Sequence, residues 1–141
     1  YQTPKLDTRA AIFRNDKILL VQANNGTWSL PGGWVDVDCS VGENTVKEVK
    51  EEAGLDVRAD LVIAIQDRDK HNLPVYPYKV TKVFMLCSLL GGSFQENIET
   101  RGSGYFSLEE LRKLAEGKNT KEQIALCFEA YHAKEWVTQF E

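Results

Sequence analysis

Three glutamates, Glu48, Glu51 and Glu52, stand together in the stretch KEVKEEAGL at positions 47–55. At about 100° per residue, their side chains fall within about a third of the circumference of a helix. Carboxylates one turn apart repel each other by about 0.2–0.5 kcal/mol, so the arrangement needs a compensating cause. One explanation is a solvated, charged helix face on which Lys47 pairs with Glu51. The other is a site that binds a cation.

The segment before these glutamates predicts a glycine loop that leads into a capped helix. Residues 31–33, Pro-Gly-Gly, form a loop that would need unusual backbone freedom. Ser40 and Glu43 match the S-x-x-E capping box, and Gly54 is placed to end the helix. The helix would bring its carboxylates near the carbonyls of the loop. Oxygen ligands of this kind suit Mg²⁺, which also binds phosphate oxygens and acidifies a bound water.

The rest of the chain alternates between strand and helix patterns. We expect strands at residues 8–13, 17–21, 57–66, 80–90 and 104–106, the first two joined as a hairpin. Apolar residues at helical spacing predict further helices at 107–116 and 120–133. The sequence has no internal repeat and no linker, so one α/β domain over residues 1–141 fits best. The chain begins without Met, which leaves open an additional N-terminal segment.

The stretch GGWVDVDCSVGENTVKEVKEEAGL, residues 32–55, resembles the Nudix box, whose pattern is G-x5-E-x7-R-E-U-x-E-E-x-G-U with U an aliphatic residue. Gly33 starts the pattern, and positions 47–55 fill its second half in register. The resemblance is closest to bacterial members described as ADP-ribose or CDP-choline pyrophosphatases. It implies an α/β/α sandwich with a mixed sheet. It also implies a Mg²⁺ ion, with Mn²⁺ as an alternative, held by Glu48, Glu51, Glu52 and the Gly32 carbonyl.

The reaction implied by this resemblance is attack of water on the diphosphate of a nucleoside diphosphate linked to another group. The partner would be a small nucleotide substrate. The competing hypothesis is a Nudix-fold module that senses a nucleotide without cleaving it. Three repelling carboxylates favour the enzyme, because a binding module without a metal has little reason to keep them.

The chain departs from the family pattern at three positions. Cys39 stands where the box has Glu, and Lys47 stands where it has Arg; in the family these two residues commonly form a salt bridge. Cys39 is either a small buried residue or a reactive thiol whose pKa is lowered by the helix N-terminus. Many family members also carry a Glu at the position of Gly102. We expect a mobile loop around residues 95–104 to replace it, with Glu99 as the base in preference to Glu96.

A polar segment after the strand at 57–66 suits substrate binding. Arg68 and Lys70 could reach phosphates, and Tyr76 or Tyr78 could stack on a base or ribose. An ordinary charged loop with aromatic edges explains the same residues. Trp34 follows the glycine loop and could line the mouth of a pocket.

The composition excludes several classes of protein. The 141 residues carry a net charge of -4, which argues against a general binder of nucleic acid or of anionic membranes. No apolar run is long enough for a membrane helix, and we expect no signal peptide. Three widely spaced cysteines without a CxxC motif indicate reduced thiols and a cytoplasmic location. Aromatic residues near the C-terminus suit packing or a homodimer contact.

Overall fold

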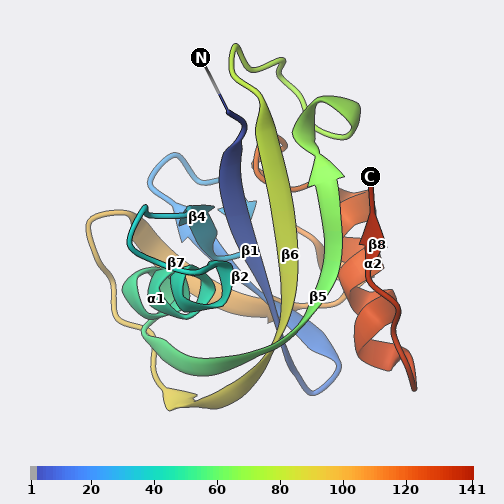
Figure 1. The fold of residues 1–141 in the computed structure, drawn as a ribbon. Coiled ribbons are helices and arrows are strands. Elements are labelled where there is room, and N and C mark those ends of the chain that lie inside the picture. Colours follow the sequence, from blue (N-terminus) through green and yellow to red (C-terminus); the bar gives the residue numbers. More distant parts are fainter. Residues whose placement is uncertain (1–2) are drawn as a thin grey trace.

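The computed structural model describes residues 3–141 (Figure 1). Its strands are β1 (Lys5–Arg14), β2 (Lys17–Ala23), β3 (Trp28–Ser29), β4 (Gly32–Trp34), β5 (Leu55–Asp67), β6 (Val80–Gly92), β7 (Thr100–Phe106) and β8 (Gln139–Phe140). Its helices are α1 (Val41–Ala53) and α2 (Lys121–His132), with short 3-10 turns η1 (Arg68–Lys70) and η2 (Leu108–Glu110). No helix within residues 3–141 is both long enough and apolar enough to cross a membrane.

The strands form a mixed sheet with the order β3-β2-β1-β6-β5-β8, in which β4 also pairs with β1 and β7 with β2. Strands β1 and β6 run parallel in the centre, and β5 pairs antiparallel with β6. Because successive side chains of a strand point to opposite faces, the sheet has two cores. Ile12 and Met85 pack under α1, whereas Ala11 and Phe84 pack under α2. Figure 1 shows the two helices on opposite sides of the sheet, so the predicted α/β/α sandwich is confirmed.

The helix predicted after the glycine loop is confirmed in detail. Ser40 accepts a hydrogen bond from the Glu43 backbone N–H, and the Glu43 carboxylate accepts one from the Ser40 N–H, which completes the capping box. Gly54 ends the helix with a φ of 71°, a left-handed conformation that favours glycine. Val49 and Ala53 are buried against the sheet. Local sequence signals therefore fix both ends of the helix that carries the glutamates.

The helix predicted at residues 107–116 is wrong. Only η2 is helical there, and the backbone then runs beside Trp28, whose N–H donates to Lys113 O and whose carbonyl accepts from Ala115 N. Leu108, Leu111 and Leu114 pack against the core under α2 without a helix. Their spacing of three residues reflects burial in an irregular segment, because the strand edge at Trp28 supplies its hydrogen bonds.

Two further expectations also need correction. The strand expected at 104–106 is longer, since β7 begins at Thr100 and pairs with β2, which leaves less room for a mobile loop. The glycine loop contains β4, and neither Gly32 nor Gly33 has a positive φ. Gly32 is required for another reason: a Cβ there would lie 1.8 Å from the Thr8 carbonyl oxygen of β1. Close approach of two backbones, and not conformational freedom, explains this glycine.

Candidate active site

A cavity of about 540 Å³ opens between β1, β4, β6 and α1. Its wall is strongly charged. The acidic side chains on it are Asp7, Asp36, Glu48, Glu52 and Glu99. The basic ones are Arg9, Arg68, Lys82 and Lys118. Two aromatic residues, Trp34 and Tyr76, stand on the same wall.

Glu48 and Glu52 form the acidic side together with the glycine strand β4. They are four residues apart on α1, so both side chains point from the same face of the helix. The Gly32 N–H donates to Glu52 Oε1 at 3.3 Å. A Cβ on Gly33 would lie 3.0 Å from the Glu48 carboxylate, so the bare glycine lets that side chain lie against β4. The two carboxylates and the backbone of β4 therefore line one region of the cavity.

The local environment disfavours the charged forms of both glutamates. Burial, the largest cause, and the charge of Glu48 together raise the pKa of Glu52 to about 7, against the opposing effects of Arg9 and the Gly32 N–H. Burial also raises the pKa of Glu48, and the charges of Glu51 and Glu99 add to the effect. Two half-buried carboxylates that repel each other and face a cavity form an all-oxygen donor set, which fits a hard divalent cation.

Glu51 is placed apart from the other two. It is exposed on α1 and borders a separate depression of about 430 Å³, which is also lined by Lys50 and by residues 92–93 and 95–97. Glu96 lies at the same depression, whereas Glu99 lines the cavity itself. The wall of the cavity thus contains Glu48, Glu52 and Glu99, whereas Glu51 and Glu96 line the neighbouring depression, although Glu51 is close enough to Glu48 to raise its pKa.

The segment that carries Glu99 is held in place by hydrogen bonds. Asn97 Oδ1 accepts from the N–H groups of Glu99 and Thr100, both at 3.0 Å. Thr100 Oγ1 donates to the Glu52 carbonyl at 2.7 Å, which ties this segment to the end of α1. Glu99 therefore reaches the cavity without the loop movement that the sequence suggested. Gly102, in contrast, lies within β7 opposite Gln22.

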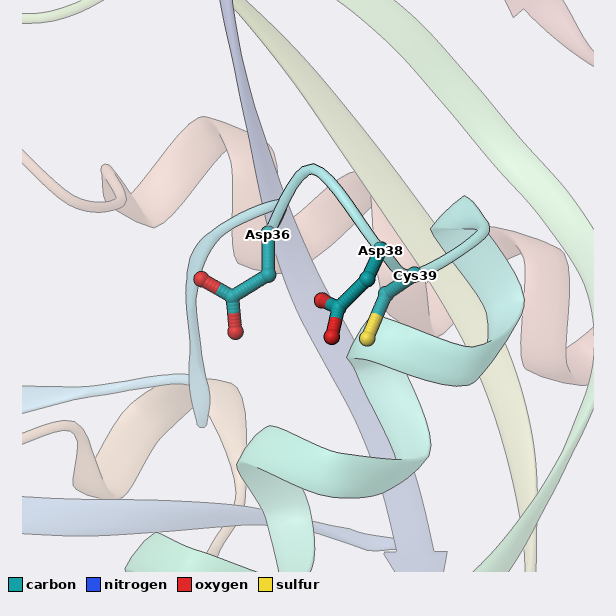
Figure 2. A group of neighbouring side chains, drawn as sticks. All are labelled: Asp36, Asp38 and Cys39. Atoms are coloured by element: carbon teal, nitrogen blue, oxygen red, sulfur yellow. The ribbon is translucent and has the colours of Figure 1, made fainter.

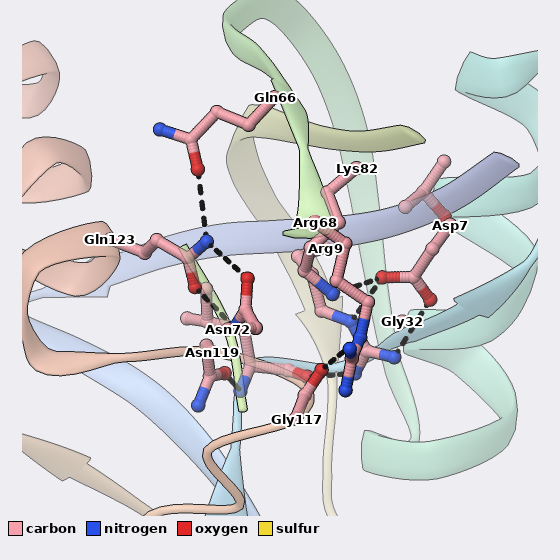
Figure 3. Close-up of polar contacts among 12 residues, drawn as sticks. Asp7, Arg9, Gly32, Gln66, Arg68, Asn72, Lys82, Gly117, Asn119 and Gln123 are labelled. Atoms are coloured by element: carbon pink, nitrogen blue, oxygen red, sulfur yellow. Dashed lines mark hydrogen bonds and ion pairs between the residues drawn. The ribbon is translucent and has the colours of Figure 1, made fainter. Parts of the chain in front are cut away.

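The basic side contains a buried network that the sequence analysis missed. Asp7 accepts from Arg9 Nη2 at 2.9 Å, from Arg9 Nε at 3.1 Å and from Lys82 Nζ at 2.6 Å (Figure 3). Arg9 Nη1 also donates to the Leu30 carbonyl at 2.9 Å, just before the glycine strand. Burial raises the pKa of Asp7, but the two cations outweigh it and lower this pKa to about 2. The sequence did contain a signal: Asp7 and Arg9, two residues apart and therefore on one face of the strand, directly precede its apolar residues 10–13.

The predicted substrate residues divide into two groups. Arg68 is buried and on the cavity wall; its Nε donates to Gly117 O at 3.2 Å and its Nη1 to Pro74 O at 2.9 Å. Its guanidinium lies 5.4 Å from the centre of the Tyr76 ring, so it also supports that ring. Lys70 is exposed and does not line the cavity.

The aromatic residues continue from the cavity to its outside. Trp34 is 47% exposed at the mouth, with its ring 6.2 Å from that of Tyr76. Tyr78 lies 5.8 Å beyond Tyr76 and borders a second cavity of about 850 Å³, whose wall also includes Trp34. Three aromatic rings thus run from one cavity to the next.

At the two altered box positions, Cys39 and Lys47, a different ion pair replaces the salt bridge that is common in the family. Lys47 pairs with Asp36 in the loop, so a carboxylate three residues earlier replaces the one absent at Cys39. Figure 2 shows Cys39 beside Asp38, with Asp36 in the same loop. The thiol is half-buried, and partial desolvation together with Asp38 and Glu43 raises its pKa. The hypothesis of a reactive thiol with a lowered pKa is therefore wrong.

Comparison with known proteins identifies one matching family and several similar proteins. The NUDIX domain family matches residues 4–127. The crystal structure of an ADP-ribose pyrophosphatase from Streptococcus suis superposes with a TM-score of 0.93 at 65% identity, covering 99% of this chain and 100% of that one. The crystal structure of a UDP-X diphosphatase gives a TM-score of 0.91 at 35% identity, over 99% of this chain and 68% of that one.

Two curated sequences are also similar. The Bacillus subtilis protein called "putative ADP-ribose pyrophosphatase YjhB" is 40% identical over 130 residues, which are 92% of this chain and 62% of that protein. An ADP-ribose pyrophosphatase of Methanocaldococcus jannaschii is 30% identical over 122 residues, 82% of this chain and 69% of that protein. The chain thus spans less than two thirds of the length of the Bacillus relative.

Proposed function

The chain belongs to the Nudix family, and from this premise we propose that it is a pyrophosphohydrolase that cleaves a nucleoside diphosphate derivative such as ADP-ribose or CDP-choline. The observation that carries the proposal is the cavity, whose two sides have opposite charge. Carboxylates on α1 lie on one side, and buried cations lie on the other. A diphosphate that is bound together with a divalent cation has the charges to bridge the two sides. The names of relatives at 65% and 40% identity support the same substrate class.

Glu48, Glu52 and the Gly32 carbonyl would hold the cation, Mg²⁺ or Mn²⁺. The all-oxygen donor set and the raised pKa values of both glutamates support this assignment. When bound, such an ion neutralises phosphate charge and makes a water molecule more acidic. Glu51 belongs to the proposed ligand set from the box pattern, but its place outside the cavity gives it the weakest support.

Glu99 is proposed as the base that accepts the proton of the attacking water. It stands on the cavity wall, and its charge raises the pKa of Glu48, so the two carboxylates are close enough to interact. The hydrogen bonds of Asn97 and Thr100 hold the segment in this position before substrate binds. A base held ready near the site of attack contributes about 10²- to 10⁴-fold in rate.

The substrate would lie across the basic side and the aromatic mouth. Arg68 can face a phosphate with the part of its guanidinium that does not bind Pro74 and Gly117. Trp34, Tyr76 and Tyr78 offer ring faces to a base or ribose. Lys70, exposed and away from the cavity wall, could meet only a part of the substrate that extends outside.

The test is a panel of compounds assayed with Mg²⁺, with Mn²⁺ and with EDTA: ADP-ribose, CDP-choline and a nucleoside triphosphate. We expect turnover of the diphosphate compounds, no turnover in EDTA, and a loss of kcat by orders of magnitude in Glu52→Gln. Glu96→Gln is the matched control, because it removes the same charge outside the cavity. Activity in EDTA would refute the metal assignment. Tight binding of one compound without turnover would favour the alternative, a nucleotide-sensing module.

Two further proposals concern the location of the protein in the cell and its assembly. We propose a cytoplasmic protein, because Cys39, Cys87 and Cys127 are all free thiols, which suits a reducing compartment. A homodimer could form through the C-terminal segment, where Val137 and Phe140 are 85% and 78% exposed. Sedimentation of Phe140→Ser beside the unaltered protein tests this contact: the unaltered protein should sediment as a dimer and the variant as a monomer. A monomeric unaltered protein or a dimeric variant would refute it.

A further inference from the structure

The buried side of the cavity holds more positive than negative charge. Arg9 and Lys82 are 5% and 2% exposed, and both bind the single carboxylate of Asp7. Within the part of the chain that the structure describes, Arg68 is 6% exposed and is bound only by backbone carbonyls. Figure 3 shows Arg9 and Lys82 bonded to Asp7, and Arg68 bonded to the Gly117 carbonyl. Buried charge without a partner of opposite sign is costly, so this wall is suited to receive an anion.

The carboxylates of Glu48 and Glu52 do not act equally on the three buried cations. The charges of both act on Arg9, which stands nearest to the α1 carboxylates. Lys82 instead is affected by Asp7, Arg9 and Arg68, and burial together with the two guanidinium groups lowers its pKa to about 8, against the effect of Asp7. The excess positive charge is therefore shared by Lys82 and Arg68, which are close enough for the charge of Arg68 to lower the pKa of Lys82.

The ammonium group of Lys82 has donors to spare. It carries three N–H groups and, among residues 3–141, forms one hydrogen bond, to Asp7 Oδ2 at 2.6 Å. The side chain lies on the cavity wall with Val80, two residues earlier on the same face of β6. The parallel pairing of β1 with β6 sets Lys82 directly opposite Asp7, so the carboxylate fixes the direction of the ammonium group.

We propose that Lys82 is a substrate-binding residue whose ammonium group, oriented by Asp7, donates hydrogen bonds to an oxygen of the substrate's diphosphate. The inference rests on the proposed function and assigns a residue to its phosphate-binding side. Asp7 then acts as a positioning residue: it holds Lys82 toward the cavity and Arg9 toward the α1 carboxylates. No covalent step is involved.

The experiment measures by calorimetry how tightly the metal-loaded protein binds methylenediphosphonate, a diphosphate analogue in which a CH₂ group replaces the bridging oxygen and prevents hydrolysis. Lys82→Met removes the charge and keeps an unbranched side chain, while the salt bridge between Asp7 and Arg9 remains. We expect about 10- to 100-fold weaker binding, the range for loss of a charged hydrogen bond. Affinity for Mn²⁺ alone, followed by electron paramagnetic resonance, should not fall, because Lys82 contributes no ligand. Lys17→Met, at a surface pair with Glu110, is the matched control and should bind normally.

The outcomes separate this inference from the proposed function. If the unaltered protein neither binds the diphosphonate nor cleaves any compound of the panel, both fail. If it binds and Lys82→Met binds equally well, Lys82 has only a structural role. If Lys82→Met does not fold, NMR of the unaltered protein with isotope-labelled lysine tests the inference instead. The pKa of Lys82, about 8, distinguishes its signal from those of exposed lysines and should rise on binding. An unchanged pKa overturns the inference.

Discussion

Replacing Asp7 by Asn should destabilise the protein strongly and in a way that depends on pH. The carboxylate is buried and binds Arg9 through two nitrogens and Lys82 through one. Its pKa of about 2, against the ordinary 3.8, corresponds to about 2 kcal/mol of stability at neutral pH. Asn also leaves two buried cations without a counter-charge, and breaking a buried pair in this way costs about 3–5 kcal/mol. The expected loss at pH 7 is therefore about 2–5 kcal/mol.

The pH dependence has a definite sign. The pKa of Asp7 is lower in the folded protein, so its stabilising charge is fully present above the unfolded value of 3.8 and is lost as the pH falls toward 2. The free energies of unfolding of the unaltered protein and of Asp7→Asn should therefore differ most at neutral pH. The difference should shrink between about pH 4 and about pH 2, because the unaltered protein loses the same charge there.

Urea denaturation at a series of pH values measures both quantities. Asp56→Asn is the matched control: Asp56 pairs with Lys50 at 3.1 Å on the surface, and its loss should cost less than about 1 kcal/mol. A difference between the Asp7 variant and the unaltered protein that stays constant from pH 7 to pH 2 would refute the buried-charge reasoning. A loss no larger than that of the control would do the same.

Three further expectations concern the site. Glu99→Gln should lower kcat by about 10²- to 10⁴-fold and Glu96→Gln hardly at all, since only the former lines the cavity; equal kcat values in steady-state assays would exclude this segment from the chemistry. Gly32→Ala should cost about 1–3 kcal/mol or more in a thermal melt, because its Cβ would overlap a backbone oxygen, whereas Gly42→Ala, with open space, should be neutral or stabilising. Cys39→Glu should change stability by less than about 1 kcal/mol in urea, because the loop position is half-exposed; unfolding would contradict that placement.

The sequence by itself determined the features that depend on neighbouring residues. Ser40 and Glu43 specify the start of α1 through hydrogen bonds three residues apart, and Gly54 specifies its end. The same short stretch carries the family pattern and the carboxylates. Glu99 was also identified, although for a mobile loop, whereas hydrogen bonds from Asn97 and Thr100 hold it at the cavity.

Only the tertiary structure decided which charged residues share the cavity. Glu51 is next to Glu52 in the chain, yet it borders a different depression, because β4 packs beside Glu48 and Glu52. Asp7 and Lys82 are 75 residues apart and become neighbours through the register of β1 against β6. Register depends on how the whole sheet buries its two faces, and a one-residue slip would send Lys82 to the opposite face. A buried cation that looks isolated in the sequence gains its partner, and its direction toward the cavity, from that pairing alone.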